Sequence, residues 1–117
     1  MQAKPTIVKR GEWARDPEHW RGRLEGERIG AGVTVLFFSS ETPGAGPKLH
    51  VHPYEELFII RRGRARFTVG DEELEAEAGD IVFGPANTPH KFVNLGPGRL
   101  ETTDIHLSER WIQTDLE

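Results

Sequence analysis

Apolar and polar residues alternate in short segments along the whole chain, and glycine and proline separate these segments. The 117 residues include thirteen glycines and eight prolines. Such breakers recur about every eight to twelve residues, a spacing typical of short strands joined by turns. The pattern predicts an all-β domain, either a barrel or a sandwich. The length predicts a single domain, residues 1–117, because a second unit would lack the residues for its own core.

The most apolar of the expected strands covers residues 33–38, where valine, threonine, leucine and phenylalanine follow one another without a breaker. A loop rich in glycine and proline follows at residues 39–47. Further strands are expected at residues 48–52, 57–61, 65–69, 81–83, 91–93 and 100–107.

The two ends of the chain are expected to be less regular. Residues 6–9 have an extended pattern. Asp16 followed by Pro17 favours a short helical turn, because aspartate caps helices and proline suits their first position. In the tail, Ile112 and Leu116 stand four residues apart, as they would on one side of a helical turn. We therefore expect short helical turns near both termini.

A run of arginines followed by a run of acidic residues marks residues 61–77. It admits two interpretations, a basic recognition patch or an amphipathic hairpin. A two-residue turn at Gly70 and Asp71 sets a hairpin register with charges on one face and apolar residues on the other. The expected pairs are Arg66 with Glu75, Arg64 with Glu77, Phe67 with Leu74, and Ala65 with Ala76. This pairing favours a hairpin with a solvated face of ion pairs.

The composition is that of a mildly acidic globular protein. Hydrophobic residues make up 36% of the chain and charged residues 29%, with a formal net charge of -4. This charge argues against general nucleic-acid binding, which needs a clustered positive excess. The sequence shows neither the long apolar run of a membrane span nor the apolar region of a secretory signal. We therefore expect a cytoplasmic protein without a membrane partner.

The chain has no cysteine, so any metal ion must be bound by histidine and carboxylate side chains. His50 and His52 are two residues apart in an expected strand, which points both side chains to the same face. Glu56 has matching parity along the next strand, and His90 begins a later one. Three imidazoles and one carboxylate suit a divalent ion such as Fe, Mn, Zn, Ni or Co.

The spacing of these residues resembles the two sequence motifs of the cupin superfamily. The first motif, G-x5-H-x-H-x3-E-x6-G, is matched by Gly44, His50, His52, Glu56 and Gly63. The second, G-x5-P-x-G-x2-H-x3-N, is matched by Gly79, Pro85, His90 and Asn94. One position departs from the motif, since Asn87 stands where glycine is usual. Asparagine also tolerates the left-handed conformation, so we expect the turn to persist.

The resemblance covers about residues 33–107 and implies a small antiparallel two-sheeted β-barrel of the cupin, or jelly-roll, type. Residues 1–32 would then pack on this barrel or on a partner. In metal-binding cupins, the motif residues that this chain shares hold one ion in the mouth of the barrel. The resemblance therefore implies one divalent metal ion per chain, with the following ligands: His50, His52, Glu56 and His90.

Two further residues are candidates for a catalytic role. His106 ends the last expected strand, beside the barrel interior, where it would line the pocket or support a ligand. Tyr54 lies between two expected ligands, where a phenol can donate a proton, although packing of the loop is the simpler interpretation. His19 has no ligand spacing and is expected at the surface.

The set of three histidines and one glutamate resembles that of cupin dioxygenases and implies a metal-dependent, dioxygenase-like enzyme acting on a small organic substrate. Two alternatives stay open because a fold does not decide its chemistry. One is a non-catalytic cupin that binds a small ligand. The other is a metal-dependent isomerase or epimerase, in which Tyr54, Asp104 or His106 would act as the base.

Residues 35–38 and 57–60 are apolar at every position. A strand of a free-standing antiparallel barrel needs only one apolar face. One face fills the barrel, and either the N-terminal segment or a second subunit must cover the other. We therefore expect a homodimer.

Overall fold

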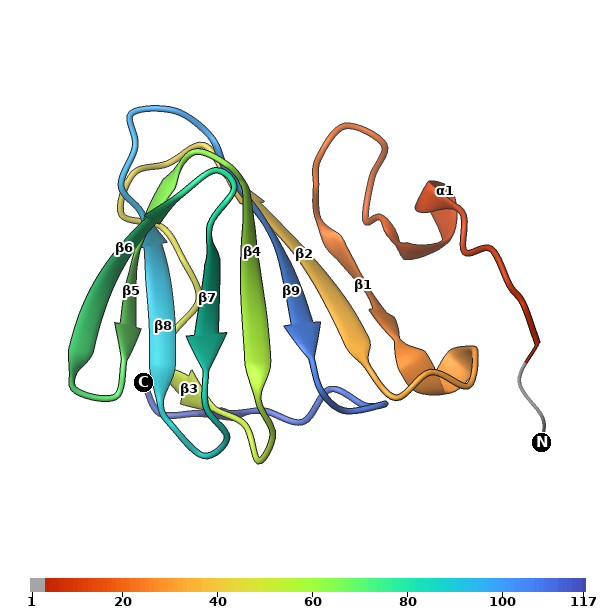
Figure 1. Cartoon of the computed structure of the whole chain (residues 1–117). Helices are drawn as coiled ribbons and strands as arrows, with labels where there is room; N and C mark the ends of the chain where they lie inside the picture. The colour runs from red at the N-terminus through yellow and green to blue at the C-terminus, as the bar shows by residue number, and fades with distance from the viewer. Residues whose placement is uncertain (1–3) are drawn as a thin grey trace.

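The computed structural model describes residues 4–117 and consists of two antiparallel five-stranded sheets that face each other (Figure 1). The strand order of one sheet is β1 (Gly22–Glu25), β2 (Thr34–Ser40), β9 (Leu100–His106), β4 (Glu56–Arg62) and β7 (Ile81–Gly84). The order of the other is β10 (Thr114–Asp115), β3 (His50–Val51), β8 (His90–Asn94), β5 (Arg64–Val69) and β6 (Glu72–Glu77). The predicted all-β, two-sheeted jelly-roll fold is confirmed, although the sheets do not close into a continuous barrel.

The apolar core fills the space between the sheets at one end. Along β4 the inward side chains are Glu56, Phe58 and Ile60, because side chains alternate along a strand. Phe58 lies 5.0 Å from Phe67, and Phe67 lies 5.0 Å from Phe92, measured between ring centroids. The core therefore occupies the part of the sandwich near Ile60 and leaves the end near Glu56 for polar residues.

The β5–β6 hairpin has the register predicted from its turn, with Arg66 opposite Glu75 and Arg64 opposite Glu77. The expected ion pairs are wrong, however, because no salt bridge joins these side chains within the described part of the chain. The Arg64 guanidinium instead donates to the carbonyl oxygen of Gly96 at 3.4 Å. Solvated side chains gain little from pairing, so register alone does not bring them together.

The helical turns are placed differently from the sequence prediction. Helix α1 covers Arg10–Trp13, and a 3-10 turn, η1, covers Gly26–Arg28. Asp16 caps no helix, since its carboxylate accepts backbone N–H groups in a bend. The tail forms β10 in place of a helical turn, because its backbone pairs with β3. Residues 6–9, expected to be extended, lie outside the assigned strands.

The N-terminal segment packs on the outer face of the first sheet. Trp13 stacks on Phe37 of β2 with ring centroids 3.6 Å apart, and Trp20 meets the same ring edge-on at 5.1 Å. The Trp20 indole N–H donates to the hydroxyl of Thr103 on β9 at 3.2 Å. This covers the part of the outer face formed by β2 and β9.

None of the helices among residues 4–117 is long and apolar enough to cross a membrane.

Candidate metal centre

Four buried side chains meet at the polar end of the sandwich. His50 lies in β3 directly opposite His90, the first residue of β8. Glu56 is the first residue of β4, and His52 follows β3. One ligand atom of each residue lies within 4.8 Å of the ligand atoms of the other three. The fold thus brings together all four residues that the sequence spacing selected as metal ligands.

The turn before β8 supports this arrangement. Asn87 has a φ angle of 60°, the left-handed conformation that it was predicted to tolerate in place of glycine. Its backbone N–H donates to the carbonyl oxygen of His52 at 2.8 Å. The departure from the motif therefore leaves the turn intact and ties it to the loop that carries His52.

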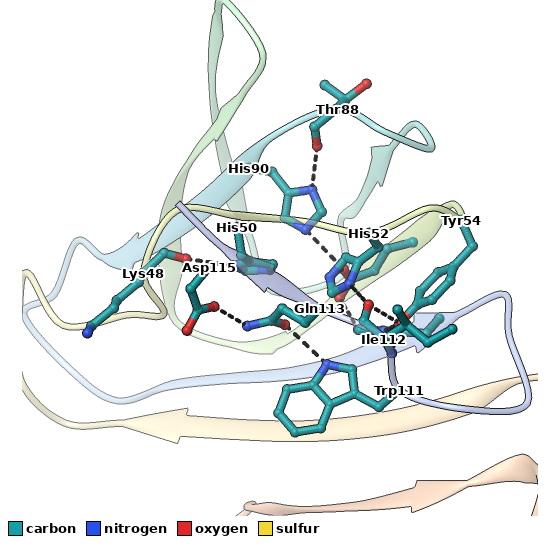
Figure 2. A network of polar contacts seen from close by, with 12 residues as sticks. Lys48, His50, His52, Tyr54, Thr88, His90, Trp111, Ile112, Gln113 and Asp115 are labelled. Carbon is teal, nitrogen blue, oxygen red and sulfur yellow. Dashed lines mark hydrogen bonds and ion pairs between the residues drawn. The ribbon is translucent and has the colours of Figure 1, made fainter. Parts of the chain in front are cut away.

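The Nδ1 atom of each of the three histidines donates a hydrogen bond to a backbone carbonyl oxygen (Figure 2). The distances from Nδ1 to the carbonyl oxygens are 2.5 Å for His50 to Lys48, 2.7 Å for His52 to Ile112, and 3.1 Å for His90 to Thr88. Because a carbonyl only accepts, each Nδ1 carries the proton and each Nε2 of a neutral ring has a free lone pair. This orientation through the second nitrogen is the one that metal-binding histidines use.

The Nε2 lone pairs of the histidines and the Glu56 carboxylate are directed at one another. The Oε1 atom of Glu56 lies 3.3 Å from Nε2 of His52 and 3.1 Å from Nε2 of His90. These three buried atoms have no hydrogen-bond partner among the described residues, so the short distances are contacts without hydrogen-bond geometry. Converging lone pairs and a carboxylate repel one another unless a cation lies between them. The donor set therefore fits a divalent metal ion.

The electrostatics keep these groups in their ligating forms. Burial is the main cause that lowers the pKa of His50, which favours the neutral ring that binds metal. Burial alone would raise the pKa of Glu56, but a proton on a facing histidine nitrogen, that of His106 first, outweighs it and holds this pKa far below its usual range. The carboxylate is therefore anionic at neutral pH.

His106 and Tyr54, the two candidate catalytic residues, are buried next to Glu56. The Nε2 atom of His106 lies 2.9 Å from Oε2 of Glu56 without hydrogen-bond geometry, and its Nδ1 lies 2.7 Å from the Tyr54 hydroxyl. The same hydroxyl contacts both the backbone N–H and the carbonyl of Ile112 at 3.1 Å. Burial raises the pKa of Tyr54, which keeps the phenol protonated. The other histidine considered, His19, is exposed and pairs with Asp16.

Asp104 is a further buried acid close to this group. It stands on β9 opposite Phe58 of β4, on the same inward face as His106. Its side chain is nearly fully buried, and its Oδ1 atom has no hydrogen-bond partner in residues 4–117. Burial, together with the charge of Glu56, raises the pKa of Asp104 well above the usual value. From the sequence, Asp104 was expected only as a possible base of the isomerase or epimerase alternative.

A pocket of about 720 Å³ opens from the candidate metal centre. Its inner end is lined by His50, Glu56 and His106, and its walls include aromatic side chains. This volume lies in the range of pockets that enclose small organic ligands. The aromatic residues that form its walls are Trp13, Phe37, Phe38, Phe58, Phe92 and Trp111.

The C-terminal strap, residues 108–117, closes one side of the pocket and was not recognised from the sequence. The carbonyl oxygen of Ile112 accepts from His52, and Trp111, Gln113 and Asp115 line the pocket beside the histidines (Figure 2). The strap is held by backbone contacts, including the N–H of Leu116 donating to Leu49 at 2.8 Å. The spacing of Ile112 and Leu116 favoured a helical turn here and gives no sign of these contacts, which depend on the fold.

The fold and the site together define a jelly-roll protein with a buried His-His-Glu-His group suited to a metal ion. The cupin domain family profile matches residues 37–106. The chain therefore belongs to the cupin family.

Among curated proteins, the chain is 34% identical over 95 residues to an uncharacterized protein of Methanocaldococcus jannaschii, covering 80% of this chain and 70% of the relative. It is also 36% identical over 44 residues to an uncharacterized protein of Streptomyces coelicolor, covering 38% of this chain and 42% of that protein.

Among solved structures, Bacillus subtilis oxalate decarboxylase is similar, with a TM-score of 0.78 and 22% identity in a structure whose title names its Mn(II) centers. The match covers 91% of this chain and 30% of the decarboxylase, so the chain spans about a third of that protein's length. A structure of the same decarboxylase at pH 4.6 gives a TM-score of 0.74 and 23% identity, covering 81% of this chain and 27% of the decarboxylase. At this level of identity, the likeness shows the fold alone.

Proposed function

We propose that the protein is a metal-dependent, dioxygenase-like enzyme that acts on a small organic substrate. The observation that carries this proposal is the convergence of histidine Nε2 atoms and the Glu56 carboxylate, without hydrogen bonds between them, at the inner end of the pocket. We propose one divalent ion per chain, such as Fe, Mn, Zn, Ni or Co, with these ligands: His50, His52, Glu56 and His90.

When bound there, such an ion would supply Lewis acidity and, for iron or manganese, one-electron redox chemistry. The residues around it prepare the site for a substrate. The backbone carbonyls of Lys48, Ile112 and Thr88 fix the three rings, so that no reorientation is needed on binding. The aromatic walls exclude water, which strengthens electrostatic interactions inside the pocket. Tyr54 and His106 hold a proton between Oη and Nδ1, which makes them the proposed acid–base pair.

Oxygen uptake tests the reaction class. The protein is loaded with Fe(II) or Mn(II) and assayed with an oxygen electrode against enols, diketones and catechol-like phenols. We expect metal-dependent uptake with at least one of these substrates, and its loss in His50→Ala. Absence of uptake across the panel, together with a bound compound that is recovered unchanged, would replace this proposal with the non-catalytic binding protein.

A metal-dependent isomerase or epimerase is the second candidate. His106 and Asp104 line the same pocket, so two groups able to exchange protons would face a substrate there. Isomerisation of a substrate under argon, with the metal present and at an unchanged rate, would favour this candidate over the dioxygenase.

We also propose that the protein is a cytoplasmic homodimer that binds no nucleic acid or membrane. The outer face of the first sheet carries an apolar row across adjacent strands, in which Val35, Ile105, Leu57 and Phe83 are register neighbours. The N-terminal tryptophans cover the neighbouring Phe37 and Thr103. Phe83 is 51% exposed and Ile81 is 63% exposed. A second copy of the chain would cover this remaining part of the face.

Light scattering tests the dimer. We expect the mass of two chains at micromolar concentration, and dissociation by Phe83→Glu. Leu74→Glu is the matched control, since Leu74 is 40% exposed on the other sheet. A wild-type mass of 13.2 kDa would contradict the dimer.

A further inference from the structure

Four basic side chains line the pocket, although the chain as a whole has a net charge of -4. They lie on the N-terminal segment, on or beside β1, and in the loop before β3. None of them forms a salt bridge with any residue from 4 to 117. The pocket therefore presents unpaired positive charge, and these are its basic residues: Arg15, Arg21, Arg23 and Lys48.

Two of these arginines are held against aromatic rings. The guanidinium carbon of Arg21 lies 5.3 Å from the ring centroid of Phe38, and that of Arg23 lies 4.5 Å from the ring of Trp111. Stacking on a ring face orients the planar guanidinium but leaves the N–H groups at its edge free to donate. Such a fork matches the two oxygens of a carboxylate.

The sheet register places Arg23 on the edge strand β1, away from the candidate metal centre. Arg23 on β1 is opposite Leu36, which is opposite Asp104, which in turn is opposite Phe58 on β4. Three strand spacings of about 4.8 Å put the Arg23 backbone about 14 Å from β4. Figure 1 shows β1 at the outer edge of this sheet. The Arg23 side chain spans part of the distance between β1 and β4. The space that is left between them has the size of a small molecule.

The acidic residues of the pocket do not cancel this charge. Glu56 and Asp115 are two carboxylates against four basic side chains, and Glu56 belongs to the metal group. Asp104 is only 4% exposed, and its Oδ1 has no hydrogen-bond partner within the described chain. Burial raises its pKa, which favours the acid form that can donate a hydrogen bond to an oxygen of a ligand.

We propose that the pocket binds a small organic carboxylate with a flat apolar body, whose carboxylate is held by Arg21 and Arg23 while its other end faces the metal group. The inference rests on the proposed function for the placement of that other end. The aromatic walls contact the body, and Asp104 meets a polar group along it. The chemical class is therefore an aromatic or similarly planar organic acid.

Isothermal titration of the metal-loaded chain of residues 1–117 tests the inference with two pairs of probes. Benzoate is compared with benzamide, and phenylpyruvate with phenylpyruvamide, because each amide keeps the shape and removes the charge. We expect each acid to bind about tenfold or more tightly than its amide, the range of a charge-assisted hydrogen bond. Phenyl phosphate and glucose complete the panel.

The variants separate this inference from the proposed function. Arg21→Gln/Arg23→Gln should reduce the preference for acid over amide to about one. Arg66→Gln, the same change on the exposed hairpin, should keep the wild-type preference. Metal content and Tm are measured in all variants, so that lost binding is not mistaken for lost metal or fold. A retained preference without oxygen uptake would leave the inference standing while the reaction class fails.

Equal binding of acids and amides by the wild-type protein, binding of neither, or binding of phenyl phosphate or glucose alone would overturn the inference. A preference that survives in the Arg21→Gln/Arg23→Gln variant would overturn it as well. The wild-type comparison decides the question even if the double variant does not fold.

Discussion

The Tyr54 hydroxyl has three polar contacts next to the candidate metal centre. It contacts Nδ1 of His106 at 2.7 Å and both backbone polar groups of Ile112 at 3.1 Å. Removal of such a hydroxyl costs more free energy than the loss of one hydrogen bond, because several buried polar groups are then left without a partner.

Tyr54→Phe should therefore lower the free energy of unfolding by about 1–3 kcal/mol, the cost of leaving buried polar groups unpaired. Urea denaturation measures the change. Thr34→Val is the control, because the buried Thr34 hydroxyl has no hydrogen-bond partner in residues 4–117 and its loss should not destabilise. Equal destabilisation by both variants would contradict the role assigned to the Tyr54 hydroxyl.

Asp104 gives a pH dependence of the opposite sign to that of an ordinary surface carboxylate. Its pKa is raised in the folded protein, so the folded state binds the proton more tightly than the unfolded state. Its contribution to stability is complete below the unfolded-state value near 3.8 and is lost as the pH rises toward the folded-state pKa. Burial of the charged form is the first cause.

Asp104→Asn should remove this loss. Both proteins are compared without metal. We expect the free energy of unfolding of Asp104→Asn, minus that of the wild type, to increase as the pH rises from about 4 to 7. Denaturant titrations of both proteins at several pH values measure this difference in the free energy of unfolding. A difference that does not change with pH would show that Asp104 titrates normally in the folded protein.

At the scale of elements, the strands with strong apolar patterns were predictable and the weakly patterned ones were not. The predicted strand at residues 33–38 corresponds to β2, and the turn at Gly70 set the hairpin register correctly. Strand β1, Gly22–Glu25, was missed because its Gly-Arg-Leu-Glu sequence has low β propensity. It is a strand because β2 offers an unpaired edge.

The C-terminal strap is the element whose function depends most on tertiary contacts. Deletion of residues 109–117 removes β10 and the carbonyl of Ile112 that orients His52. We expect metal affinity to fall about 10- to 100-fold, as when a partner that orients a ligand is lost. Competition with a chromophoric chelator measures the affinity.

The matched control is deletion of residues 1–9, where Ile7 is 75% exposed and the residues described lie outside helices and strands. This deletion should leave metal affinity unchanged. Equal affinity of the strap deletion and the wild-type protein would show that the strap does not support the site.

At the scale of the whole molecule, the sequence motifs were enough to predict the four proposed ligands. Their spacing fixes the strand faces on which the side chains lie, and the structure places these residues close together: His50, His52, Glu56 and His90. The unpaired arginines of the pocket could not be selected in this way. Arg21 and Arg23 face the site only because β1 joins the sheet and the strap brings Trp111 over it.

The central claim is that these four residues hold one divalent metal ion. The most direct test is elemental analysis of protein purified without chelators, comparing the wild-type protein with His50→Ala/His52→Ala. His19→Ala is the control, since His19 is exposed and outside the site. The account predicts one divalent ion per chain in the wild type and in His19→Ala, and almost none in the folded double variant. Stoichiometric metal in His50→Ala/His52→Ala would contradict it and place the ion elsewhere.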